Sequence, residues 1–271
     1  KNNKFKFEDK QGTRRKESIF KNLNSFFGNM RVGQIEQKHI DKYINKRSNK
    51  ATEGTIRLEL TYLMSVINYG IKRKLIKIED KPSFDMPPAP QPRARVLSQN
   101  ELSRILESLE PQRQERMSRM YRFVILAMET GSRKSALLEL KWSQIDFENG
   151  LIHLNPDDRA QTSKHRPSIP MSDNLRHMLT QAKKEAFSEY VLDSKSDIHY
   201  QFKKKMNQLS LSDVTPHVFR HTWATWAAQN NISMYEIAGV LGDTIETVTR
   251  NYLHQCPQHL RSAVNFTNGL Y

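Results

Sequence analysis

The stretch TPHVFRHTWATW places three side chains that carry charge or protons at helical spacing. His217, Arg220 and His221 are three and four positions apart, so on a helix they share one face. Thr215 is a suitable N-cap and Pro216 suits the first helical position, which puts His217 in the opening turn. Unpaired backbone N–H groups and the helix dipole favour an anion there, so the pattern predicts an anion-binding face.

Two other interpretations fit the same spacing. A His-x-x-x-His pair can bind zinc, but the helical metalloprotease motif has Glu directly after the first His, and here that residue is Val218. The face can also be a solvated one, with Trp223 and Trp226 packing the opposite side of the helix. A short motif does not decide between these interpretations, so the rest of the chain must.

The composition narrows the class of partner. The chain of 271 residues has 43 Lys and Arg against 29 Asp and Glu, a net charge of +14 that is typical of nucleic-acid-binding proteins. A single cysteine, Cys256, excludes an internal disulfide framework and favours a reducing, cytoplasmic setting. We find no P-loop, dinucleotide fingerprint, signal peptide or membrane-spanning run, so we expect no cofactor, no metal and no membrane partner.

A proline-rich segment divides the chain. Residues 81–95, KPSFDMPPAPQPRAR, contain five prolines and cannot sustain a helix or a central strand, so we interpret them as an interdomain linker. Residues 1–80 have 19 Lys and Arg against 9 Asp and Glu, whereas residues 81–271 have 24 against 20. The sequence therefore predicts a smaller, more basic domain at 1–80 and a larger domain at 96–271.

Residues 1–80 have the periodicity of a small helical domain. Basic residues lie near the ends of the expected helices, and Arg57, Lys72, Arg73 and Lys74 are candidates for contact with a phosphate backbone. Each of them alone also fits a solvated surface, but the charge of the whole domain favours phosphate contact. Three apolar stripes at helical spacing predict the core: Ile19, Leu23, Phe26 and Phe27; Ile40, Tyr43 and Ile44; and Ile56, Leu60, Leu63, Met64, Ile67 and Ile71.

The larger domain begins with helices. The residues SQNE at 98–101 form a capping box that opens the first helix, and a second helix around 117–129 should end at Gly131. Ser132 is a possible cap for a third helix headed by Arg133.

The periodicity then changes to that of strands. The segment QIDFENGLIHL carries the hairpin signal Asn149-Gly150, and RPSIPM can add a third strand after a loop that contains Lys164. Helices around one small antiparallel sheet predict an α+β domain.

Two further helices are expected at the end of the chain, in SMYEIAGVLGD and TIETVTRNYLH. Ser233 and Glu236 form a second capping box, and Gly242 should end the first of these helices. The second carries an apolar stripe that includes Tyr252, which by itself fits a core aromatic residue.

Four motifs, TGSR, TSKHRPSIP, HVFRHTWAT and LGDTIETVTRNYLH, occur in an order and spacing that resembles the tyrosine recombinases, or phage-type integrases. The segment ATEGTIRLELTYLMSVINYGIKRKLI is similar to the core-binding domain of that family, and the resemblance covers roughly residues 17–254. It implies a mainly α fold, with an N-terminal helical SAM-like core-binding domain and a C-terminal catalytic domain with a small antiparallel sheet. The two domains would clamp duplex DNA.

The resemblance also implies a reaction. Tyr252 would attack a DNA phosphodiester, form a 3′-phosphotyrosyl link and release a 5′ hydroxyl, without metal or ATP. Arg133 and Arg220 match the family's two arginines, which would stabilise charge on the non-bridging oxygens. His217 would handle a proton, and Lys164 would protonate the leaving 5′ oxygen.

Three positions complicate this assignment. Arg166 is an alternative to Lys164 if the register of the hairpin loop is shifted, and His221 is expected to support the site from behind the residues that touch phosphate. The family usually has an acidic residue three places after its first arginine, but here that residue is Ala136. Asp243 replaces the family's His or Trp, so we expect it either to repel the phosphate or to hold His217 or His221.

The family resemblance predicts a phage or mobile-element enzyme that is a monomer in solution and a tetramer on two DNA sites. The tail at 257–271 would be exchanged between subunits, or would fold back on its own subunit. Two alternative functions are a type IB topoisomerase and a catalytically silent DNA-binding regulator. Asp243 and Ala136 favour the regulator, whereas the intact tyrosine, arginines and histidine of the motifs oppose it.

Overall fold

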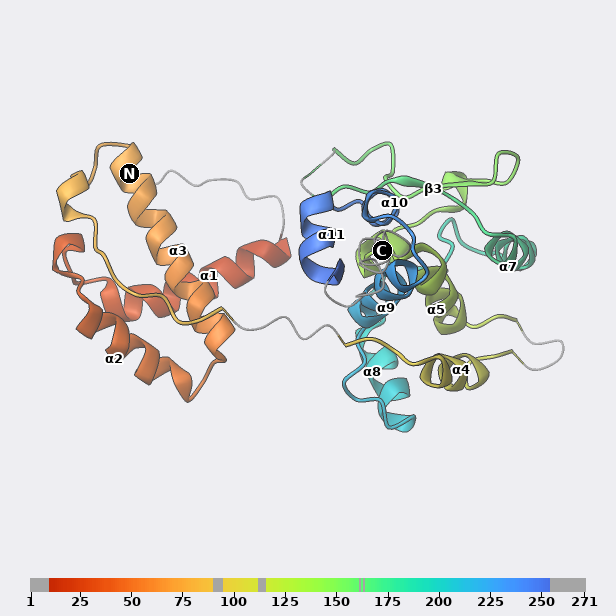
Figure 1. Cartoon of the computed structure of the whole chain (residues 1–271), viewed down its shortest axis with the longest axis horizontal. Coiled ribbons are helices and arrows are strands. Elements are labelled where there is room, and N and C mark those ends of the chain that lie inside the picture. The colour runs from red at the N-terminus through yellow and green to blue at the C-terminus, as the bar shows by residue number, and fades with distance from the viewer. Residues whose placement is uncertain (1–9, 90–94, 112–115, 161, 163, 254–271) are drawn as a thin grey trace, which may run out of the picture. The chain divides into compact units, whose positions relative to one another are not determined.

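The computed structural model describes residues 10–89, 95–111, 116–160, 162 and 164–253, with side chains from residue 14 onward. The backbone is mostly helical with one small sheet, which confirms the predicted fold class (Figure 1). The elements are α1 (Lys10–Phe27), α2 (Gln37–Ser48), α3 (Glu53–Lys72), α4 (Gln99–Glu107), α5 (Arg119–Thr130), α6 (Lys134–Leu138), β1 (Ile145–Asp146), β2 (Leu151–His153), β3 (Ser168–Pro170), α7 (Asp173–Lys184), α8 (His199–Gln208), α9 (Pro216–Gln229), α10 (Met234–Leu241) and α11 (Ile245–Tyr252), with 3-10 turns at Val32–Gln34, Ile78–Asp80 and Trp142–Gln144.

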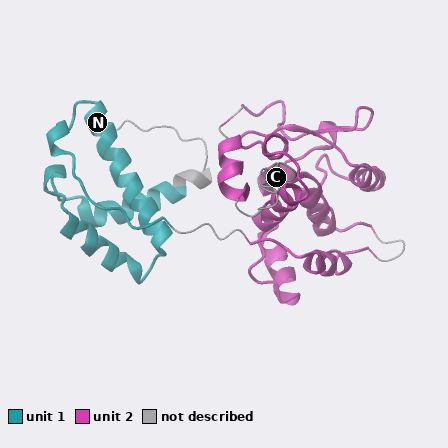
Figure 2. Ribbon diagram, in the orientation of Figure 1, with its two compact units in different colours: residues 1–92 teal, residues 93–271 magenta. Residues whose placement is uncertain are grey.

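The chain forms two compact units, residues 1–92 and residues 93–271 (Figure 2). The division lies inside the proline-rich segment 81–95, of which residues 90–94 are outside the described residues. Among the helices that the structure describes, none has both the length and the hydrophobicity needed to cross a bilayer.

Helices α1, α2 and α3 build the core of the first unit. The three predicted stripes supply most of it, and Leu60 and Ile40 are fully enclosed. Aromatic rings close one end, where Phe26 and Phe27 contact the ring of Tyr43 with centroids 5.3 and 5.1 Å away.

A buried carboxylate ties the three helices together. Glu59 on α3 is 1% exposed and accepts hydrogen bonds from Tyr43 Oη at 2.8 Å and from Asn22 Nδ2 at 2.9 Å. Arg47 on α2 donates to both of its oxygens, at 2.8 and 2.9 Å. A buried charge is stable only when it is paired and hydrogen-bonded, and Glu59 is both.

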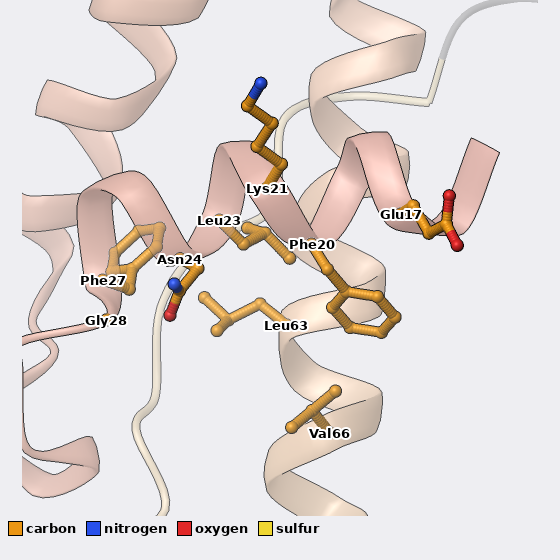
Figure 3. Close-up of a pocket in the computed structure, with 9 residues that line it drawn as sticks. All are labelled: Glu17, Phe20, Lys21, Leu23, Asn24, Phe27, Gly28, Leu63 and Val66. Atoms are coloured by element: carbon orange, nitrogen blue, oxygen red, sulfur yellow. The ribbon is translucent and has the colours of Figure 1, made fainter. Parts of the chain in front are cut away.

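An apolar groove lies on the first unit between α1 and α3 (Figure 3). Leu23 and Leu63 form its floor, while Phe20 and Val66 are 41% and 47% exposed at its edge. Phe20 is held by an edge-to-face contact with Tyr62, with ring centroids 6.0 Å apart.

Helices α5 and α9 pack together at the centre of the second unit. Three buried rings from different helices stack edge-to-face in its core, Phe123 against Phe202 and Phe202 against Phe219. Helices α10 and α11 pack on the other side of α9 and form a smaller cluster that contains Val248 and Tyr252.

The sheet is three-stranded and antiparallel in the order β1-β2-β3, which confirms the predicted hairpin and third strand. Ile152 pairs with Ile145 on one side and with Ile169 on the other, and all three side chains are buried in the core. The turn between β1 and β2 has Gly150 at a φ of 67°, and the Asp146 carboxylate accepts the backbone N–H groups of the turn.

Most helix ends lie where local residues predict them. Both capping boxes form, α5 ends at Gly131 and α10 ends at Gly242. One local expectation was wrong: Ser132 does not cap α6, because its hydroxyl is buried and Arg133 occupies the N-cap position. Thr215 occupies the N-cap of α9 as predicted, with Pro216 in the first turn, although the Thr215 side chain makes no capping hydrogen bond.

Candidate active site

Arg220 lies at the centre of the site and is only 3% exposed. Its Nη1 donates to the backbone carbonyls of Gly131 at 3.1 Å and Leu241 at 3.0 Å. These carbonyls lie at the C-terminal ends of α5 and α10, where the helix dipoles favour a cation. The two glycine-terminated helices therefore fix the buried guanidinium from two sides.

Arg133 is held by the loop that joins β2 to β3. Its Nη1 donates to the carbonyl of His165 at 3.0 Å. The loop lies so close to the C-terminal end of α10 that a Cβ on Gly242 would be 2.6 Å from the His165 oxygen and 2.8 Å from Pro167 Cδ. Gly242 also has a φ of +63°, so both space and backbone conformation require glycine here. The end of α10 thus positions the loop, and the loop positions Arg133.

Asp243 lies directly between the two arginines. One oxygen of its carboxylate accepts from Arg133 Nη2 and the other from Arg220 Nη2. The carboxylate thus bridges the two guanidinium groups instead of holding His217 or His221, and whether it repels a phosphate there stays a prediction. A neighbouring anion favours a charged arginine, and a carboxylate between two forks also orients them. With Ala136 at the place of the usual acidic residue, Asp243 is the acidic partner of Arg133 in this structure.

Tyr252 is buried on α11, where it is 2% exposed, and its hydroxyl contacts a histidine. Its Oη lies 2.9 Å from Nδ1 of His221, and the two ring centroids are 5.7 Å apart. The imidazole of His221 thus contacts the predicted nucleophile, and its expected supporting role stays a prediction. Helix α11 brings Tyr252 against α9, and no local pattern in either helix predicts that contact.

Both members of this pair are neutral at pH 7. Burial raises the pKa of Tyr252 above its usual value, although the charge of Arg220 acts in the opposite direction. Burial, with the charges of His217 and Arg220, lowers the pKa of His221 to about 4. A neutral phenol beside a neutral imidazole is the starting state for a proton transfer from oxygen to nitrogen.

His217 lies one turn before His221 on the same face of α9. The two rings meet edge-to-face with centroids 4.5 Å apart. Partial desolvation, with the positive charges of Arg220 and Arg133, lowers the pKa of His217 below its usual value. The spacing thus brings the three predicted side chains of α9 together, as the sequence indicated.

Lys164 is exposed in the loop between β2 and β3, and its backbone N–H donates to Thr162 Oγ1 at 3.3 Å. Arg166, the alternative to it, pairs with Glu139 Oε2 at 2.7 Å and its side chain is 9% exposed. The structure therefore uses Arg166 to hold the loop, while Lys164 remains at the surface.

These groups make a site suited to an anionic ester. Two fixed guanidinium groups converge on one carboxylate, and a tyrosine hydroxyl and two imidazoles lie on the adjoining helices α9 and α11. Guanidinium pairs are well matched to the charge that develops on phosphoryl oxygens during transfer.

Comparison with known families decides the identity. The model of the phage integrase family matches residues 95–259, and the model of its N-terminal SAM-like domain matches residues 11–48. The chain belongs to the phage integrase family. The predicted resemblance is confirmed, and the first match includes every residue of the site described above.

The curated relatives of this integrase-family chain are integrases and tyrosine recombinases. It is 23% identical to the integrase of Salmonella phage P22 over 228 residues, which cover 78% of this chain but 56% of that protein. It is also 23% identical to a XerC-like tyrosine recombinase of Caldanaerobacter subterraneus subsp. tengcongensis, over 92% of this chain and 74% of that protein. These relatives confirm a tyrosine site-specific recombinase or integrase and favour neither a topoisomerase nor a silent regulator.

A solved structure shows the same fold. The Tn1549 transposon integrase in complex with circular intermediate DNA superposes with a TM-score of 0.79 at 15% identity, over 96% of this chain and 95% of that one. The arrangement of helices and sheet is therefore that of an integrase with both of its units represented.

The four predicted DNA-contacting residues of the first unit differ in their exposure. Lys72, Arg73 and Lys74 are exposed at the C-terminal end of α3, with Arg73 placed over the ring of Tyr69. Arg57 is partly buried and donates to the carbonyl of Pro87 in the proline-rich segment.

Sequence reasoning missed a basic surface on α8 of the second unit. Tyr200, Lys203 and Lys204 are exposed there around a shallow hollow. The run of three lysines at 203–205 was the available signal.

Proposed function

We propose that this chain cleaves and rejoins duplex DNA at specific sites through a 3′-phosphotyrosyl intermediate, without metal or ATP. The observation that carries the proposal is the convergence of Arg133 and Arg220 on a single carboxylate beside the helix of Tyr252. Two guanidinium groups aligned by one carboxylate would bind the scissile phosphate beside it through their remaining N–H groups.

Each residue has a defined role in the proposed reaction. Tyr252 Oη attacks phosphorus, and the bond from phosphorus to the 5′ oxygen breaks. Arg133 and Arg220 stabilise the charge on the non-bridging oxygens, which is greatest in the transition state. Lys164 protonates the leaving 5′ oxygen, and His217 donates a hydrogen bond to the phosphate from the exposed face of α9.

The first unit would act as the core-binding domain. Its exposed cations Lys72, Arg73 and Lys74 would contact the phosphate backbone, and Arg57 would hold the proline-rich segment against the N-terminal half of α3. The basic surface on α8 would add contacts from the catalytic domain. The source would be a phage or another mobile element, as for the P22 integrase and the Tn1549 transposon integrase.

The active assembly would be a tetramer on two DNA sites, formed from monomers that are separate in solution. The tail at 257–271, which lies outside the described residues, would be exchanged between neighbouring subunits. In this position directly after the nucleophile helix, the tail would couple assembly to the placement of Tyr252.

The test is the formation of a covalent adduct. Nicked duplexes with a randomised centre are incubated with the protein, and the adducts are recovered under denaturing conditions to isolate a cleavable sequence. We expect a protein–DNA adduct that is released by a nuclease and not by hydroxylamine, because the link is a phosphotyrosyl ester.

The matched control is Tyr252→Phe, which keeps the ring and removes the hydroxyl. We expect this variant to bind the selected duplex with nearly unchanged affinity and to form no adduct. Persistent adduct in this variant would assign the nucleophile elsewhere. Tight sequence-specific binding with no adduct from the unaltered protein would support the silent regulator instead, whose basis is the carboxylate of Asp243 in the anion site.

A further inference from the structure

The nucleophile in this site has a partner that the family resemblance does not assign. Tyr252 Oη lies 2.9 Å from His221 Nδ1, whereas His217, the histidine of the motif, contacts the ring of His221. The order in space is thus His217, His221, Tyr252. A tyrosine that attacks phosphorus must lose its proton, and among the residues that the structure describes His221 lies within hydrogen-bond distance of that hydroxyl.

We propose that His221 is a catalytic residue that accepts the Tyr252 proton during cleavage and returns it during rejoining. The inference rests on the proposed function. As the bond from Tyr252 Oη to phosphorus forms and the bond to the 5′ oxygen breaks, the phenol proton moves to His221 Nδ1. The 5′ oxygen takes its proton from Lys164. In rejoining, both protons move back and the tyrosine leaves as a phenol.

The surroundings of His221 fit a transient acceptor. Its neighbours are Arg220 and His217 on α9, Asp243 after α10 and Tyr252 on α11. Burial, together with the charges of His217 and Arg220, keeps the resting imidazole neutral, so its lone pair is available at neutral pH. When a phosphate binds beside the two arginines, its negative charge offsets theirs and makes a protonated His221 less costly. The acceptor therefore becomes more basic when substrate is present.

Because the Tyr252 hydroxyl is buried, its proton needs an acceptor within the protein. Tyr252 is 2% exposed, so bulk water has little access to its hydroxyl. Burial also raises the pKa of the phenol, which leaves almost none of it ionised at neutral pH. A positioned base of this kind contributes roughly 10²- to 10⁴-fold in rate.

The experiment compares His221→Asn with His217→Asn on the selected nicked duplex. An asparagine oxygen can take the place of Nδ1 as a hydrogen-bond acceptor but cannot take up a proton. We expect His221→Asn to bind DNA as the unaltered protein does and to form adduct about 10²-fold more slowly or worse. Its rate should rise about tenfold per pH unit, because hydroxide must then remove the proton.

The pH profile separates catalysis from folding. We expect His217→Asn, the matched control, to keep the shape of the unaltered profile, whatever its rate. If His221→Asn forms adduct at the unaltered rate, or with an unaltered pH profile at a lower rate, His221 is not the acceptor. Thermal unfolding of both variants identifies any loss of fold.

A second variant keeps the test decisive if asparagine is not tolerated. His221→Gly leaves a space into which free imidazole can diffuse, and added imidazole should restore adduct formation in it but not in the double variant with Tyr252→Phe. Failure of imidazole to restore the rate in a folded His221→Gly protein overturns the proposal. Absence of adduct from the unaltered protein would instead reject the proposed function.

Discussion

Arg133 and Arg220 donate hydrogen bonds to the two oxygens of one carboxylate, that of Asp243. Arg133 precedes α6 and Arg220 lies on α9, so the carboxylate links two elements that are distant in the sequence. The other hydrogen bonds described for these two guanidinium groups go to backbone carbonyls. Asp243 therefore orients both arginines before any DNA is present.

The first prediction concerns Asp243→Asn. Removing one negative charge beside the DNA phosphate should raise DNA affinity slightly. Cleavage should nevertheless fall about 10- to 100-fold, because both arginines lose the group that aligns them. Adduct formation on the selected nicked duplex measures the rate. Faster cleavage by the variant would show that the carboxylate competes with the phosphate instead of orienting the arginines.

A double variant tests the same idea from the other side. Asp243→His combined with Ala136→Glu restores the family's acidic residue three places after the first arginine. We expect this pair to cleave faster than Asp243→His alone. Circular dichroism must accompany the measurement, since Ala136 is buried. Equal rates in a folded double variant would contradict the assignment of Asp243 as the substitute.

The second prediction contrasts the two arginines. Arg133→Ala and Arg220→Ala should each slow adduct formation by about 10²-fold or more, the scale for loss of one transition-state donor. Their stabilities should differ. Arg220→Ala leaves the carbonyls of Gly131 and Leu241 without their buried donor, at a cost of roughly 1–3 kcal/mol each. Arg133 is 26% exposed, so urea unfolding should show a smaller loss. Equal stabilities would contradict the structural role of Arg220.

The third prediction concerns salt dependence. Alanine at Lys72, Arg73 and Lys74 together should reduce the slope of log affinity against log salt by up to about 3, because each cation that no longer meets a phosphate lowers the slope by about 0.9. The control is Lys21→Ala, which removes an exposed cation at the apolar groove of α1. A slope that changes as much in the control as in the triple variant would remove this surface from the proposed interface.

The fourth prediction concerns stability and pH. Burial opposes ionisation of Glu59, but hydrogen bonds from Arg47, Tyr43 and Asn22 outweigh it and lower the pKa of this carboxyl. A carboxyl with a lowered pKa stabilises the fold above its usual value of about 4.5, and this contribution is lost as the pH falls through the folded value. Chemical unfolding of the first unit should therefore show a less stable fold below about pH 5.

Two variants separate charge from packing at this position. Glu59→Gln should flatten the pH dependence while keeping the side-chain shape, although its NH2 group cannot accept the hydrogen bonds that one carboxylate oxygen accepts. Glu59→Ala should cost about 3–5 kcal/mol at pH 7, because Arg47 then lacks its partner. An unaltered pH dependence in Glu59→Gln would show that other carboxyls cause it.

The fifth prediction concerns the tail. Deletion after Cys256 should reduce strand exchange between two selected sites more than binding to one site. Binding is measured by gel shift, and exchange by the recombinant product. Recombination at the unaltered rate by the truncated protein would reject tail exchange between subunits.

Local patterns in the sequence determined the helix ends and the motif residues. The capping boxes at Ser98 and Ser233 form because each involves a hydrogen bond within a single turn. Gly131 and Gly242 end their helices because the left-handed conformation favours glycine. The common face of His217, Arg220 and His221 is also a local property, because helical periodicity alone places residues three and four positions apart on one side of a helix.

Tertiary structure alone decided the partners of those residues. Arg133 and Asp243 are 110 positions apart, and His221 and Tyr252 are 31 apart, so no turn or period relates them. Their contacts depend on how α10 and α11 pack against α9, which buried apolar side chains determine through shape and volume. From the sequence, Asp243 could either repel the phosphate or orient a neighbouring side chain. Its pairing with Arg133 and Arg220 depends on the packing of α10 against α9, which the sequence alone does not show.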